Sequence, residues 1–331
     1  MRCAAAAMIA LLTSAWPVAA QDSHLLVIVG LSGSPENGDL FHRWALGLVE
    51  AAEGRYGLQK ENVVYLSEDP ARDPARIDGR ATREGIRGAV ERLATRARPG
   101  DRVFVVLIGH GASAQGEARF NLPGLDLSAR EYAGLLDRLG AQTVVFANTA
   151  SASGGFVAAL AGRDRVVIAA TRNEGERNQT RFGEFFVEAI TGSDGDIDKD
   201  GRVSMAEAFT WAQRRVAESY KRDGQLQTEH ALLDDNGDGA GTDATGQPGG
   251  DGALARTLYL SASVDGRPGP NAAVDPALRA LYDEQRALEQ RVAALKSSRA
   301  KMDAAEYERE LEQLLIALAR KSREIREKEK R

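Results

Sequence analysis

From His24 onward, short apolar runs alternate with segments whose apolar residues recur at helical spacing. Parallel strands require long crossover connections, and helices supply them, so this alternation predicts an α/β fold with a mostly parallel sheet flanked by helices. Side chains with chemical roles are then expected where strands end, at the carboxyl edge of the sheet. We expect strands at Leu25–Leu31, Asn62–Leu66, Arg102–Ile108, Thr143–Ala147 and Arg165–Ala170.

The overall composition excludes some classes of protein. With 331 residues, of which 43% are hydrophobic and 27% charged, the chain is suited to one large domain plus an appendage, and a collagen-like or wholly disordered protein is excluded. Lys and Arg total 43 against 48 Asp and Glu, a net charge of -5. Bulk charge therefore predicts no nucleic-acid partner.

The first 20 residues have the pattern of a secretory signal peptide. Arg2 precedes the apolar run Ala4–Leu12, and small residues at Val18 and Ala20 fit the positions before a cleavage site. We expect an exported protein, periplasmic or secreted, whose mature chain begins at Gln21 and loses Cys3, its one cysteine. The alternative is a retained membrane anchor, but the run is shorter than the roughly 20 apolar residues of a membrane span. No span is therefore expected in the mature chain.

Two expected strands end in residues that can carry chemistry. Strand 102–108 leads into His110-Gly111, and strand 143–147 leads into a turn of small and hydroxyl residues that contains Ser151. Each motif alone also fits a structural role, because histidines often serve as hydrogen-bonding residues and small residues make tight connections. The pair resembles the caspase-like cysteine peptidases of the legumain type, the C13 family. That family has His-Gly after one strand and an acidic-Ala-Cys-x-Ser-Gly turn after the next.

The resemblance spans residues 21–264 and has two departures. Ser151 stands where the family has its nucleophilic Cys, and Thr149 stands where it has an acid. A serine hydroxyl must pass its proton to a well-oriented base during attack, and the sequence places no acid beside His110. We therefore favour a pseudo-peptidase that binds peptide in the His110/Ser151 groove. One alternative is an active serine-based peptidase or hydrolase, with His110 as base and the Gly111 region as oxyanion hole.

Residues 196–207 match an EF-hand calcium loop. Oxygen ligands are expected from carboxylates at the first, third, fifth and twelfth positions and from a carbonyl at the seventh, with Gly201 at the sharp turn. Helical spacing before and after the loop supplies the required context. The predicted cofactor is Ca²⁺, and the alternative is a solvated acidic loop. The predicted ligands are Asp196, Asp198, Asp200, Arg202 and Glu207.

A second acidic segment, residues 234–245, repeats only the first half of this pattern. Its twelfth position is Thr245, which has no carboxylate, so a turn is favoured over a second calcium site. Residues Thr257–Leu260 predict a last strand at the sheet edge.

The C-terminal part changes composition abruptly. Residues 265–274 form a predicted linker, and residues 275–331 carry leucines at three-four spacing among charged residues, which predicts a helical hairpin or coiled coil. The two helices can pack on each other, or the module can form a homo-oligomer. The remaining function to consider is accordingly a calcium-stabilised scaffold that interacts through this coiled coil.

Overall fold

The computed structural model describes residues 21–245, 250–262 and 302–329, together with six positions between 281 and 295. The predicted signal peptide, residues 1–20, and the predicted linker, residues 265–274, lie outside the described residues. Within the described part of the chain, no helix combines the length and apolar character needed to cross a membrane.

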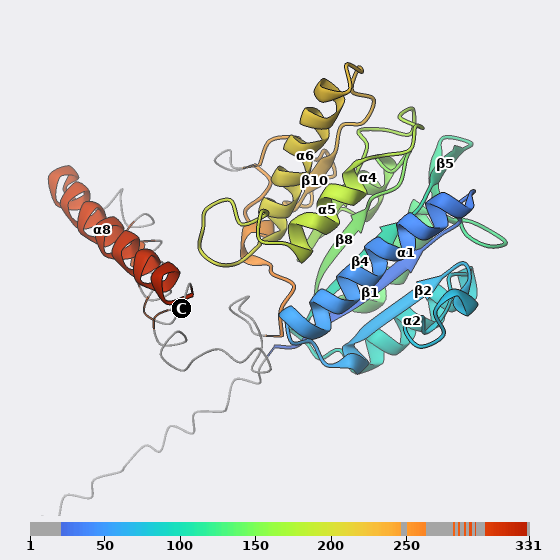
Figure 1. The fold of residues 1–331 in the computed structure, drawn as a ribbon, viewed down its shortest axis with the longest axis horizontal. Coiled ribbons are helices and arrows are strands. Elements are labelled where there is room, and N and C mark those ends of the chain that lie inside the picture. Colours follow the sequence, from blue (N-terminus) through green and yellow to red (C-terminus); the bar gives the residue numbers. More distant parts are fainter. Residues whose placement is uncertain are drawn as a thin grey trace, which may run out of the picture.

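The core of the protein is a seven-stranded sheet with the order β10-β9-β8-β4-β1-β2-β3. Neighbouring strands are parallel except for β10, which runs antiparallel to β9 (Figure 1). The prediction of a mixed α/β fold with a mostly parallel sheet is confirmed. The strands are β1 (Ser23–Val29), β2 (Val63–Ser67), β3 (Gly79–Arg80), β4 (Arg102–Ile108), β8 (Thr143–Asn148), β9 (Arg165–Ala169) and β10 (Leu232–Asp234).

Helices cover both faces of this sheet. Successive strand residues point to opposite faces, so Leu25 and Val27 pack in one apolar cluster while Leu26 and Ile28 pack in the other. The first cluster is completed by α1 (Pro35–Glu50), α5 (Phe182–Thr191) and α6 (Met205–Arg222). The second is completed by α2 (Arg83–Arg96), α3 (Ala129–Leu136) and α4 (Gly155–Leu160). Short turns of 3₁₀ or π helix lie at Ala51–Arg55, Lys60–Asn62, Pro70–Arg72, Asp137–Leu139 and Ala255–Thr257.

A small antiparallel sheet follows β4 directly. It consists of β5 (Gly111–Ala114), β6 (Glu117–Phe120) and β7 (Leu127–Ser128), in the order β5-β6-β7. Gln115 and Gly116 connect β5 to β6 with φ of 54° and 77°, the left-handed backbone that a two-residue hairpin requires. This sheet was not predicted, and it extends the chain beyond the carboxyl edge immediately after His110.

The predicted last strand over Thr257–Leu260 is wrong. Residues 255–257 form a 3₁₀ turn, and Tyr259 makes only an isolated bridge to Ser204. The backbone of this segment bonds to separate elements: the Met205 N–H donates to Leu258, and the Ser23 hydroxyl donates to Ser261. No single neighbour therefore offers it a ladder, and β10 forms the edge of the sheet instead.

The described part of the C-terminal module contains α8 (Ala304–Glu329). Val292, Leu295 and Leu314 are buried together, and Met302 and Leu311 pack against them. Asp303 accepts a hydrogen bond from the Glu306 N–H at 3.2 Å, as expected for a residue that caps the helix. Residues before and after position 302 thus share one apolar cluster, and the hairpin itself stays a prediction because most of its first half lies outside the described residues.

Candidate functional site

The carboxyl ends of β4 and β8 bring the two predicted motifs together. These strands are neighbours, with Leu107 paired to Asn148, so His110-Gly111 and the Ser151 turn emerge at one edge of the sheet. The Gly111 N–H donates to the Ser151 hydroxyl at 3.2 Å, and that hydroxyl donates to the Gly111 carbonyl at 3.2 Å. A Cβ at position 111 would lie 2.2 Å from the Ser151 carbonyl oxygen, so this approach requires glycine.

The His110 ring is oriented by groups that follow β1. Its Nε2 lies 3.0 Å from the Ser32 carbonyl oxygen and 3.3 Å from Asn37 Nδ2, so both groups hold the same edge of the ring. Asn37 Nδ2 also donates to the Ser32 carbonyl at 3.2 Å, while its Oδ1 accepts from Gln179. The Phe41 ring packs against the imidazole at a centroid distance of 5.3 Å. Sequence reasoning missed Ser32 and Asn37, although β1 borders β4 and its carboxyl end therefore lies beside His110.

The turn that bears Ser151 is held rigidly. Ala152 is fully buried with φ of 52°, a left-handed backbone that costs a non-glycine residue about 1–2 kcal/mol, and its N–H donates to the Glu176 carbonyl at 2.8 Å. Thr171 accepts hydrogen bonds from the N–H groups of Ser153 and Gly154. Hydrogen bonds from several segments thus fix the backbone of this turn in a strained conformation, as is common at functional sites.

Thr149, which occupies the family's acidic position, has a structural role. Its hydroxyl donates to the Leu107 carbonyl at 2.8 Å, and its own carbonyl accepts from the Thr180 hydroxyl at 2.5 Å. Thr149 is buried, with 2% of its surface exposed, so it offers no group to a ligand. Its contacts fasten the start of the turn to β4 and to the segment before α5.

The present arrangement holds Ser151 without activating it. The hydroxyl proton is directed to the Gly111 carbonyl, and among the described residues no hydrogen bond joins the hydroxyl to the His110 ring. Ser32 supplies a neutral carbonyl to the ring where serine hydrolases supply a carboxylate. The imidazole is therefore oriented, but among the described residues an imidazolium would have no carboxylate in ion-pair contact.

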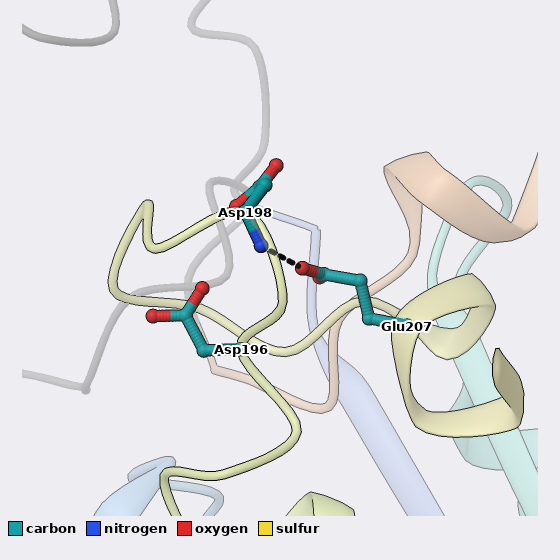
Figure 2. A group of neighbouring side chains, drawn as sticks. All are labelled: Asp196, Asp198 and Glu207. Atoms are coloured by element: carbon teal, nitrogen blue, oxygen red, sulfur yellow. Dashed lines mark hydrogen bonds between the residues drawn. The ribbon is translucent and has the colours of Figure 1, made fainter. Parts of the chain in front are cut away.

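The second candidate site is the acidic loop between α5 and α6. Asp196, Asp198 and Glu207 each offer a carboxylate oxygen, and these three atoms lie within 4.8 Å of one another (Figure 2). Glu207 Oε1 accepts from the backbone N–H groups of Ile197 at 3.0 Å and of Asp198 at 3.2 Å, so the start of α6 reaches across the loop. Three of the five predicted ligands are thereby brought together.

The backbone of the loop also follows the calcium-loop pattern. Gly201 has φ of 88° at the sharp turn, and its N–H donates to Asp196 Oδ2 at 3.0 Å. Val203, at the apolar eighth position, is only 4% exposed and anchors the loop in the core. Ser204 and Glu207 form a capping box that begins α6.

Clustering of carboxylates changes their protonation. Burial, together with the negative charges of Asp200 and Glu207, raises the pKa of Asp198 to about 7. Burial likewise raises the pKa of Asp196, and the same two neighbours add to the effect. A divalent cation would offset this repulsion, so the charge distribution favours cation binding.

Of the other two predicted ligands, Asp200 lies outside this group. The Asp200 carboxylate is ion-paired with the guanidinium of Arg202, with Nε 2.8 Å from Oδ2, and does not belong to the group of three. The Arg202 N–H donates to Asp200 Oδ1 at 2.9 Å.

In the second acidic segment, backbone N–H groups donate hydrogen bonds to carboxylates of the segment itself and of Asp251. Asp234 accepts from the N–H groups of Gly237 and Gly239, and Asp251 accepts from those of Asp235 at 3.0 Å and Asn236 at 3.2 Å. Asp251 thus makes the contacts that Glu207 makes in the first loop, from a position well beyond Thr245. In the described chain, however, only residues 196–207 bring three acidic, histidine or cysteine side chains together.

A cavity of about 300 Å³ lies away from both sites, between the end of β9, α5 and α6. Two of its titratable residues, Glu229 and His230, already have partners inside the protein. Glu229 accepts from the N–H groups of Arg181 and Phe182 at the start of α5, and His230 pairs with Glu176 at 2.6 Å. These groups stabilise the helix start and a loop, and the predicted functional residues do not line this cavity.

Comparisons with known proteins assign the chain to no family. No family model and no curated protein matches it. Among solved structures, one similar protein is GSU0716 from Geobacter sulfurreducens, with 13% sequence identity and a TM-score of 0.39, covering 59% of this chain and 89% of that one.

Proposed function

We propose that the protein is an exported homologue of the legumain-type C13 peptidases, a pseudo-peptidase that binds an extended peptide at the His110/Ser151 edge without efficient turnover. The observation that supports this function is the hydroxyl of Ser151, which shares two hydrogen bonds with Gly111 and none with the imidazole. The candidate nucleophile Ser151 and the candidate oxyanion donor Gly111 are in direct contact, but no hydrogen bond passes the hydroxyl proton to the candidate base, His110.

The small sheet provides a surface for an extended peptide. β5 starts at Gly111 and pairs with β6 on one side, and no other described strand pairs with its second side. Its residues are half-buried or exposed. An extended peptide can add to such an edge through main-chain hydrogen bonds, and would then run past Ser151.

A fluorophosphonate probe tests whether Ser151 is a nucleophile. We expect no labelling of the mature protein, while an immobilised library of extended peptides retains it. A variant with proline at Ser113 should be retained less, because in the β5/β6 register the Ser113 N–H points to the open edge and proline removes it. Labelling that disappears in Ser151→Ala would instead establish the alternative, a serine-based hydrolase. Absence of both labelling and peptide binding would refute the proposal.

We further propose that residues 196–207 bind Ca²⁺, and that this cation stabilises the α5/α6 pair. The convergence of Asp196, Asp198 and Glu207 within 4.8 Å favours this second function. Titration calorimetry of the mature protein should show calcium binding that Glu207→Gln abolishes. Calcium binding that is unchanged in this variant would assign the ion to another site.

A further inference from the structure

The fifth position of the acidic loop is occupied by an ion pair. Both partners are largely buried, with 13% of the Arg202 side chain and 12% of the Asp200 side chain exposed. Arg202 engages Oδ2 of Asp200 through Nε and Nη2, and its backbone N–H takes Oδ1. Both carboxylate oxygens that would face a cation are therefore already paired with residue 202.

Arg202 is itself fixed by a second contact. Its guanidinium carbon lies 4.7 Å from the centroid of the Tyr259 ring, a cation-π distance. Tyr259 bridges to Ser204 at the end of the loop, so the ring lies against the same backbone. Because the Tyr259 ring already holds the guanidinium, little further side-chain entropy is lost when it pairs with Asp200. The guanidinium therefore competes well with a dissolved cation for this carboxylate.

We propose that Arg202 is an internal counter-ion that lowers the calcium affinity of the loop, by holding Asp200 outside the Asp196, Asp198 and Glu207 group. This inference rests on the proposed calcium function and concerns its regulation. A bound cation either does without the fifth-position ligand or displaces the guanidinium from it. In both cases the positive charge of Arg202 opposes the incoming charge.

Two charge-matched variants test the proposal by calorimetric titration with CaCl₂. Arg202→Gln removes the paired cation, and Lys199→Gln removes one positive charge from an exposed residue of the same loop. We expect Arg202→Gln to bind Ca²⁺ about tenfold more tightly than the wild type, and Lys199→Gln to change the affinity less than threefold. Equal gains in the two variants would reduce the effect to net charge, and weaker binding by Arg202→Gln would show that Arg202 prepares Asp200 for the ion. Either result overturns the proposal.

A double-mutant cycle with Asp200→Asn provides a second measurement. Asp200→Asn should weaken calcium binding little in the wild-type background and at least tenfold in the Arg202→Gln background, where the carboxylate is released. Equal losses in both backgrounds would contradict the competition. If the wild type binds no calcium but Arg202→Gln does, Arg202 blocks calcium binding completely, which supports the counter-ion role. If neither binds, the calcium function and this inference fall together.

Circular dichroism and thermal unfolding of each variant without calcium monitor the fold. Arg202→Lys serves as the conservative replacement, because it keeps the charge but loses the planar pair of donors. We expect its calcium affinity to lie between those of the wild type and Arg202→Gln. An affinity for Arg202→Lys above that of Arg202→Gln would also argue against the competition.

Discussion

Substitution of Glu207 separates the structural and the cation-binding roles of one carboxylate. Glu207 accepts from Ile197, Asp198 and Ser204 N–H groups and from the Ser204 hydroxyl. Glu207→Ala removes the capping box, which costs about 1 kcal/mol, and leaves two loop N–H groups to partly exposed surroundings, which costs about 1 kcal/mol more. Without calcium we therefore expect a loss of about 2 kcal/mol in the free energy of unfolding.

Calcium enlarges this difference. At a calcium concentration of 100 times the dissociation constant, the wild type gains about 2.7 kcal/mol that the variant does not. The total difference of about 5 kcal/mol corresponds to a melting temperature lower by about 10–20 °C in a domain of this size. Without calcium the expected difference is about 4–8 °C.

Glu207→Gln is the matched control, because glutamine can complete the capping box but carries no charge. The glutamine amide keeps one acceptor oxygen, which can serve either Ser204 or the N–H groups of Ile197 and Asp198, so thermal unfolding with excess EGTA should place this control between the wild type and Glu207→Ala. Excess Ca²⁺ should raise the melting temperature of the wild type and of neither variant. The reasoning is refuted if calcium raises the melting temperature of Glu207→Gln as much as that of the wild type.

The remaining predictions concern the sheet edge, the pH dependence, the second acidic segment and the C-terminal module. Gly111→Ala should cost at least about 2 kcal/mol in denaturant unfolding, because its Cβ would lie 2.2 Å from the Ser151 carbonyl; a neutral effect would show that the two segments can separate. Folding raises the pKa of Asp198 from 3.8 to about 7, so the metal-free protein loses stability as the pH rises between these two values. Ca²⁺ binds the deprotonated carboxylate, so the rise in melting temperature that Ca²⁺ causes should grow from pH 5 to pH 8. A rise that is the same at both pH values would show that Asp198 does not control calcium binding. Titration of Glu207→Gln should leave no residual calcium binding if residues 234–245 form a turn, whereas residual binding lost in Asp251→Asn would identify a second site. Val292, Leu295 and Leu314 bury one another, so light scattering should give a monomer both for the full chain and for a truncation after Gly269. A dimer that forms only with the full chain would assign oligomerisation to residues 275–331.

The five longer strands of the main sheet could be predicted because most of their residues are apolar, whereas β3 and β10, with two and three residues, carry no such run. All seven residues of β1 and of β4 are buried, and a strand buried on both faces leaves that trace in the sequence. The small sheet could not be predicted in the same way. Its strands have two to four residues and mix polar with apolar side chains, so only the Gln115-Gly116 turn signals it.

The candidate sites were predictable only where side chains act through fixed spacing. The calcium-loop frame correctly grouped Asp196, Asp198 and Glu207, since a local loop places residues by number. It could not indicate that Arg202 turns back to Asp200, because Tyr259, far along the chain, helps to hold the guanidinium. The orienting partner of His110 is a backbone carbonyl, and a carbonyl is present in every residue, so no sequence pattern marks Ser32.

The two borders of the large sheet have a consequence for solubility at high concentration. β3 has two residues and β10 has three, and Leu233 of β10 already exchanges main-chain hydrogen bonds with Thr242, so each border leaves few main-chain groups unpaired. Another copy of the protein could form few hydrogen bonds there, which disfavours the border-to-border stacking that leads to aggregates. The longer, mostly apolar strands lie between these short ones, so their main-chain groups are not available for pairing with another copy of the protein.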